Sequence, residues 1–225
     1  MRYAVHPARR PGQGEQPLLI LLPGLNMHHD EFAAHGFVAA AQTTAESLEI
    51  LTIEPALDLY FDGAVAAAIS PIIRERQRRG AARIWLAGIS LGAFGALLTA
   101  SADPAAIEGL ILLAPFLGTP GLIAEVERAG GLAAWAPGPI AANDGERRIL
   151  AWLRQYASEE RDRPILRLAY GRDDRFAAAS RLLAACLPAA AVSIADGGHD
   201  WRTWMALWDR ILATRPFAAP PETRA

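Results

Sequence analysis

Short apolar runs alternate with longer amphipathic stretches along most of the chain. The run at 18–22 is continuously apolar, which is typical of a strand that helices cover on both faces. Further strands are predicted from similar runs at 48–53, 83–87, 107–113, 165–170 and 191–195. Helices are predicted at 31–41, 64–79, 92–100, 175–187 and 201–214. This alternation predicts an α/β fold, with a mostly parallel sheet and helices on both faces.

The alternation stops between positions 115 and 163, where several Gly and Pro residues occur. Two helices are predicted inside this insertion, near 122–128 and 145–158. Because the insertion leaves the carboxyl end of a strand, where open α/β sheets bind ligands, we interpret it as a short cap or lid. Packing against the back of the sheet is the alternative. Trp135 and Trp152 are candidates for contacting an apolar substrate group, or else they belong to the core.

The length and composition are those of one globular domain, expected to cover residues 1–225. Hydrophobic residues make up 52% of the chain and the net charge is -2, so neither disorder nor a nucleic-acid partner is expected. The single cysteine, Cys186, excludes an internal disulfide framework and a multi-cysteine metal site. The last segment, 215–225, contains three prolines and is expected to fray.

The sequence shows no apolar leader and no clear membrane span. Its most apolar region, at 84–100, is interrupted by three glycines and by Ser90. This region therefore predicts a buried strand, turn and helix rather than a membrane span. A cytoplasmic protein without stable membrane insertion is expected, and the oligomeric state is left open.

The segment Gly88-Ile-Ser90-Leu-Gly92 lies between a predicted strand and a predicted helix. A G-x-S-x-G sequence in that context is the signature of a nucleophile elbow. A side chain at either glycine would crowd the neighbouring strand and helix, and the serine must accept a strained backbone to expose its hydroxyl. Ser90 is therefore the candidate nucleophile.

A serine hydroxyl needs a base within hydrogen-bond reach, and the base needs an orienting acid. Behind a nucleophile elbow the acid and then the histidine follow the serine along the chain. Of five histidines only His199 follows Ser90, and it lies in a Gly-rich loop between the last predicted strand and helix. The acid is expected after the strand at 165–170, where Asp174 is preferred and Asp173 is the alternative.

The oxyanion formed by attack on a carbonyl needs two backbone N–H donors. One is expected from the residue after the nucleophile, Leu91, and the other from the loop after the first apolar strand. In that loop Gly24 allows the required backbone geometry, so Leu25 is the preferred donor and Asn26 the alternative.

These segments, spread from about residue 18 to 212, resemble the α/β-hydrolase superfamily. The resemblance rests on four sequences in this order: Pro23-Gly24-Leu25, Gly88-Ile-Ser90-Leu-Gly92, Gly171-Arg-Asp-Asp174 and Gly197-Gly-His199-Asp-Trp201. It implies the α/β-hydrolase fold, a serine–histidine–aspartate triad, and no cofactor or metal. Two features depart from the pattern: Pro23 replaces a common histidine of the oxyanion loop, and at most one leading strand fits, around 2–5.

The chain is similar to small esterases and to lysophospholipase-like and thioesterase-like members. The resemblance implies hydrolysis of a carboxylic ester through an acyl-enzyme, with a small-molecule ester or thioester as the substrate. An acyl-thioester, a lactone or a small amide is the alternative substrate for the same triad. A non-catalytic binding protein on this fold is the alternative of another class.

Overall fold

The computed structural model of the chain describes residues 1–10, 16–158 and 163–218. Within these residues seven strands form one sheet in the order β1-β3-β2-β4-β5-β6-β7. β1 is antiparallel to β3, and every other neighbouring pair is parallel, so the predicted mostly parallel sheet is confirmed. The strands are β1 (Arg2–His6), β2 (Gln16–Leu22), β3 (Glu49–Glu54), β4 (Ala81–Ile89), β5 (Gly109–Leu113), β6 (Ile165–Gly171) and β7 (Val192–Ala195).

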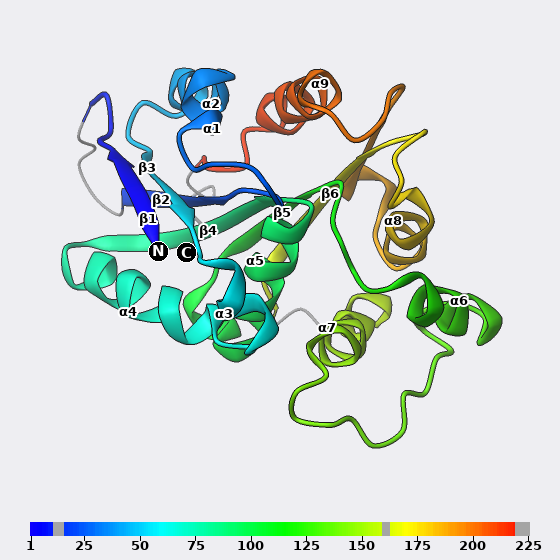
Figure 1. Cartoon of the computed structure of the whole chain (residues 1–225). Coiled ribbons are helices and arrows are strands. Elements are labelled where there is room, and N and C mark those ends of the chain that lie inside the picture. The colour runs from blue at the N-terminus through cyan, green and yellow to red at the C-terminus, as the bar shows by residue number, and fades with distance from the viewer. Residues whose placement is uncertain (11–15, 159–162, 219–225) are drawn as a thin grey trace, which may run out of the picture.

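Helices connect the strands and lie on both faces of the sheet (Figure 1). They are α1 (Glu31–Ala34), α2 (Phe37–Thr44), α3 (Leu57–Phe61), α4 (Val65–Arg78), α5 (Leu91–Ala102), α6 (Pro120–Arg128), α7 (Gly145–Leu153), α8 (Ala177–Ala184) and α9 (Trp201–Ala213). Short 3-10 turns occur at Pro104–Ala106, Arg154–Ala157 and Ala189–Ala191. No helix in the described part of the chain is long and apolar enough to cross a bilayer.

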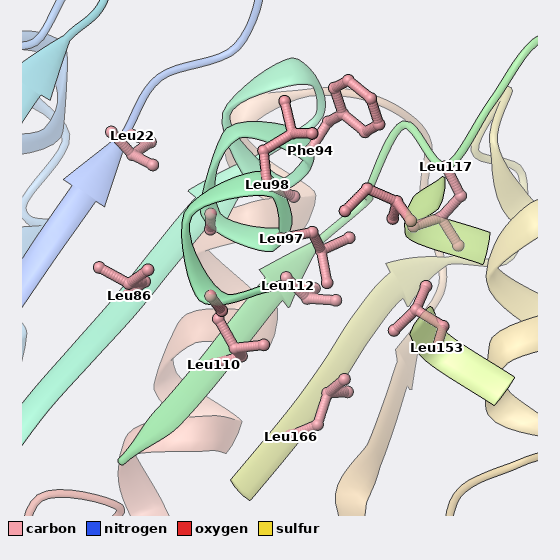
Figure 2. Close-up of a cluster of buried hydrophobic side chains, with 14 of the residues drawn as sticks. Leu22, Leu86, Phe94, Leu97, Leu98, Leu110, Leu112, Leu117, Leu153 and Leu166 are labelled. Carbon is pink, nitrogen blue, oxygen red and sulfur yellow. The ribbon is translucent and has the colours of Figure 1, made fainter. Parts of the chain in front are cut away.

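The two faces of the sheet bury two separate apolar clusters. Along β2, Leu18, Ile20 and Leu22 face one cluster, and Leu19 and Leu21 face the other. This alternation follows from the two-residue side-chain period of a strand. The first cluster lies under α4, α5 and the insertion, and Figure 2 shows leucines of α5 packed against leucines of β5 and β6. The second lies under α1, α2 and α9.

Two helical predictions differ from the structure. The stretch at 31–41 forms two helices, because Gly36 adopts a left-handed backbone at φ 85° and ends α1 there. The sequence between 54 and 64 was not predicted to be helical, yet it contains the short helix α3. This second difference is important because α3 borders the candidate site.

The C-terminal segment is docked where fraying was predicted. Phe217 is 3% exposed and packs edge-on against Trp85, with ring centroids 5.5 Å apart. The buried Arg83 guanidinium donates to the carbonyls of Phe217 (3.0 Å) and Ala218 (2.9 Å) while pairing with Glu108. The prediction is wrong up to Ala218, because a buried guanidinium needs acceptors that the tail supplies. Residues 219–225 lie outside the described chain.

The insertion packs its apolar side chains into the first cluster. Leu122, Ile123 and Val126 of α6 and Ile149 and Leu150 of α7 are all buried there. The two helices are also joined by an ion pair between Glu125 and Arg147. The body of the insertion is thus an extension of the core on this side of the sheet.

Candidate active site

Ser90 occupies a sharp turn between β4 and α5. Its backbone has φ 55° and ψ −116°, a region that residues with a side chain rarely adopt. Hydrogen bonds hold this conformation: the Ser90 N–H donates to the Leu113 carbonyl (3.0 Å), and the Ser90 carbonyl accepts from the Phe116 N–H (3.1 Å). Backbone strain that the surroundings maintain in this way is typical of functional sites.

The glycines of the turn are required by its tight packing. A Cβ atom at Gly88 would lie 2.3 Å from the backbone carbon of Gly92, and one at Gly92 would lie 2.0 Å from the Leu22 carbonyl oxygen. Neither position has room for a side chain, because the obstructing atoms belong to the backbone. The predicted crowding of strand and helix is confirmed. A Cβ at Gly24 would lie 3.3 Å from the Ser90 Cβ, so the loop after β2 lies directly against the turn.

Asp174 and His199 form a close pair at the ends of β6 and β7. The His199 Nδ1 atom lies 2.8 Å from the Asp174 Oδ2 atom. The Asp174 side chain is fully buried, and its other oxygen accepts the Phe176 N–H at 2.8 Å. Asp173 is exposed, so the carboxylate that contacts the imidazole is that of Asp174. Because an ionised carboxylate only accepts, Nδ1 donates, and Nε2 of a neutral ring is left as an acceptor.

The two loops that present this pair are held together by their backbones. The Asp173 N–H donates to the Gly197 carbonyl (3.1 Å), and a Cβ at Gly171 would lie 2.3 Å from that same oxygen. Gly197 has φ 119°, which favours glycine. The Asp200 carboxylate caps α9 by accepting the Thr203 N–H, and this hydrogen bond lowers the pKa of Asp200.

Ser90 and His199 lie at the same edge of the sheet, because β4, β5, β6 and β7 are neighbouring parallel strands. Two aromatic rings connect them: Phe116 contacts Phe176 with centroids 5.6 Å apart, and Phe176 contacts the His199 ring at 5.2 Å. Among the described residues, no hydrogen bond joins the Ser90 hydroxyl to the imidazole. Catalytic hydrogen bonds of this kind commonly tighten only when substrate binds.

The N–H groups expected to form an oxyanion hole are unengaged. Among the hydrogen bonds of the described residues, none uses the N–H of Leu25, Asn26 or Leu91. Leu91 is the first residue of α5, where the helix dipole favours negative charge. The turn closed by the Met27 N–H on the Gly24 carbonyl (3.2 Å) has Asn26 at φ 62°. Both candidate donors of this loop therefore remain available.

A cavity of about 510 Å³ opens beside Ser90. Its walls are mostly apolar and come from α3, α5 and the residues that follow β5 and β6. The side chains from α3 are Leu57, Tyr60 and Phe61, none of which was predicted to be a site residue. Four apolar or aromatic residues in the five positions 57–61, shortly after a strand, were the available signal for this wall.

The two tryptophans predicted to contact substrate do not line this cavity. Trp135 is 1% exposed, and its indole N–H donates to the Glu125 carboxylate at 3.0 Å inside the insertion. Trp152 stacks edge-on with Tyr156 and borders a separate, smaller cavity. The prediction for these two residues is wrong because Trp135 is buried within the first cluster and Trp152 packs against its border, whereas the insertion reaches the cavity beside Ser90 with Phe116 and its segment at 143–146.

Comparison with known proteins gives structural relatives only. No family model and no curated protein matches the chain. Est1E from Butyrivibrio proteoclasticus is 16% identical, with a TM-score of 0.62 over 96% of this chain and 94% of that one. An S-formylglutathione hydrolase from Agrobacterium tumefaciens is 15% identical, with a TM-score of 0.63 over 94% and 87%.

A third structure is MGS-MChE2, an alpha/beta hydrolase enzyme from a lagoon-sediment metagenome. It is 16% identical, with a TM-score of 0.56 over 96% of this chain and 93% of that one. At such low identity these likenesses bear on the fold alone. Together with the strand order they show that the chain has the fold of the α/β-hydrolase superfamily, as the sequence resemblance predicted.

Proposed function

We propose that the chain is a serine hydrolase that cleaves carboxylic esters through an acyl-enzyme. The observation that carries this proposal is the strained Ser90 turn at the edge of a mostly apolar cavity, at the same edge of the sheet as the pair of buried Asp174 and half-buried His199. A nucleophile, a base and an acid in this arrangement are the requirements of serine-based acyl transfer.

In the proposed reaction the Ser90 hydroxyl attacks the ester carbonyl and its proton passes to the free Nε2 of His199. Asp174 holds the imidazole by the 2.8 Å contact to Nδ1 and stabilises its charged form. The amides of Leu91 and of Leu25 or Asn26 hold the oxyanion. The imidazolium then protonates the leaving oxygen, and water releases the acid in a second cycle. His199 must first come within hydrogen-bond reach of Ser90.

The apolar cavity favours an apolar acyl group, and α3 rather than the tryptophans would contact it. A thioester is the second candidate substrate, because one structural relative is named an S-formylglutathione hydrolase. The insertion at 115–163 would act as a partial cap, since its segment near Glu146 borders the cavity. A cytoplasmic location stays a prediction.

The test is the response of the protein to a fluorophosphonate probe and to 4-nitrophenyl butyrate. Ser90→Ala should abolish both labelling and turnover, with a loss of about 10⁶ in kcat as in a comparable serine hydrolase. Ser101→Ala is the matched control, because that serine lies on α5, the helix that follows Ser90, and its hydroxyl donates to the Leu98 carbonyl. A folded wild-type protein that neither labels nor turns over esters would indicate a non-catalytic binding protein.

A further inference from the structure

Arg175 is the cavity's cation. Among the described residues that line the cavity beside Ser90 it is the only basic one. It is exposed, and its guanidinium carbon lies 5.0 Å from the centroid of the Phe176 ring. Because the same ring contacts His199 at 5.2 Å, one aromatic ring separates the guanidinium from the imidazole.

The guanidinium is held in place but has no anionic partner. Within the described chain no ion pair or hydrogen bond engages the Arg175 side chain, whereas the neighbouring Arg172 pairs with Asp196 at 2.9 Å. Among the described residues that line the cavity the one acidic residue, Glu146, forms no ion pair with Arg175, and one of its oxygens accepts the Thr119 N–H at 2.8 Å. The five N–H donors of Arg175 therefore lie at a mostly apolar cavity and have no protein acceptor among the described residues.

We infer that Arg175 is a specificity-determining residue that pairs with a carboxylate on the leaving group of the ester. The leaving group is the relevant side because His199 must protonate its oxygen, and the guanidinium lies one ring beyond His199. A planar guanidinium binds a carboxylate through two parallel hydrogen bonds. This inference rests on the proposed ester hydrolysis and names its substrate class, an ester of an apolar acid with an anionic alcohol or phenol.

The test compares two matched esters, 4-butyryloxybenzoate and its neutral analogue 4-butyryloxybenzamide. The ratio of their kcat/KM values cancels changes in general activity, so we expect Arg175→Gln to lower the anionic-to-neutral ratio about tenfold. Arg175→Lys, which keeps the charge but not the planar fork, should keep part of the preference. Arg172→Gln removes the same charge from the same loop away from the cavity and should leave the ratio unchanged.

A second pair places the anion on the acyl side, as the mono-4-nitrophenyl ester of glutaric acid against 4-nitrophenyl pentanoate. Arg175→Gln should change this ratio by less than about twofold, because the acyl group lies away from His199. If Arg175→Gln changed the anionic-to-neutral kcat/KM ratio equally in both pairs, Arg175 would act only through its long-range charge, and the inference would be overturned. The inference would also be overturned if Arg175→Gln left the kcat/KM ratio of the benzoate pair unchanged.

A binding measurement separates this inference from the proposed function. Calorimetry on the Ser90→Ala protein would compare 4-butyramidobenzoate with 4-butyramidobenzamide, which are amide analogues of the first pair. If the anionic amide binds more tightly than the neutral one, and Arg175→Gln abolishes this difference in affinity, the inference is supported even if no ester is hydrolysed. Ester turnover by the wild type without any such preference would instead leave the proposed function standing and overturn the role of Arg175.

Discussion

The edge of the sheet that carries Ser90 and the loops of the insertion are packed in opposite ways. At the edge, a Cβ atom added to Gly88, Gly92 or Gly171 would lie 2.0 to 2.3 Å from a backbone atom. In the insertion, a Cβ atom at Gly131 or Gly138 would meet nothing within 4 Å. Backbone contacts therefore leave almost no freedom at the edge, and the insertion is loosely packed at its loops.

The cavity wall contributed by α3 is also open to solvent. Leu57 is 44% exposed and Phe61 is 80% exposed, and both line the cavity. Exposed apolar residues that border a cavity are typical of binding surfaces. The comparison indicates that the proposed chemistry depends on rigid turns, whereas substrate preference depends on side chains that can be replaced without unfolding the protein.

The largest effect on stability is expected from Gly92→Ala. The added methyl would overlap the Leu22 carbonyl, and relief would require strand β2 and helix α5 to separate. We expect at least about 3 kcal/mol of destabilisation, the upper range for overpacking a core, measured by urea unfolding.

Gly138→Ala is the matched change in the insertion. Its φ of 65° gives the alanine some strain but no clash, so about 1 kcal/mol is expected. Equal losses of unfolding free energy in Gly92→Ala and Gly138→Ala would contradict the contrast between the rigid edge and the loosely packed loops of the insertion.

The next prediction concerns the reaction rate, and it distinguishes the two neighbouring aspartates. Asp174→Asn should lower kcat for 4-nitrophenyl butyrate about 10⁴-fold, as in a comparable triad, because an amide cannot keep Nδ1 protonated and oriented. Asp173→Asn changes an exposed side chain, so its kcat should stay within about twofold of the wild-type value. Similar losses for both variants would show that His199 is oriented differently during the reaction.

A smaller effect is expected at the cavity wall. Phe61→Ala should raise KM for 4-nitrophenyl butyrate about three- to tenfold with little change in kcat, because it removes apolar contact made equally in ground state and transition state. Its unfolding free energy should change by less than about 0.5 kcal/mol, as for other exposed residues. Tyr3→Ala, which removes an exposed ring from β1 outside the cavity, is the control for KM.

The smallest effect concerns the ion pair inside the insertion. Hydrogen bonds from Arg147 and then from the Trp135 indole lower the pKa of Glu125 to about 2. Because this pKa is lower than in the unfolded chain, the stabilisation is complete above the usual value of 4.5 and is lost as the pH falls toward 2.

Hydrogen–deuterium exchange of the segment 129–144 is the measurement, with rates corrected for pH. Glu125→Gln should exchange faster than the wild type at pH 5, and the difference should shrink toward pH 2. Glu127→Gln, an exposed neighbour on α6, should behave as the wild type. A difference that is independent of pH would show that the Glu125 charge does not hold the insertion.

The sequence predicted the parts of this molecule that local chemistry governs. The apolar runs located the parallel strands, since strands buried on both faces have few alternatives. The G-x-S-x-G segment located the strained turn, because only glycine fits positions 88 and 92. The order of residues along the chain selected His199, and the structure places it against Asp174.

Two of the failed predictions concern contacts between separate segments of the chain, and the missed helix has a local reason. The docking of Phe217 depends on Arg83, 134 residues earlier, so the prolines of the tail alone predicted fraying. Trp135 is turned inward by Glu125 and Arg147, and nothing in the local sequence distinguishes that position from one facing a substrate. The helix α3 was missed because five residues are too few for a helical period to be visible.

The sequence by itself determined the fold class, the tight turn at Ser90 and the order of the three proposed catalytic side chains, because each depends on period, steric fit or position along the chain. Only the tertiary structure decided which aspartate contacts His199, which side chains line the cavity and where the Arg175 charge lies. Those outcomes depend on which surfaces meet after folding, and the spacing of residues in a sequence does not contain that information.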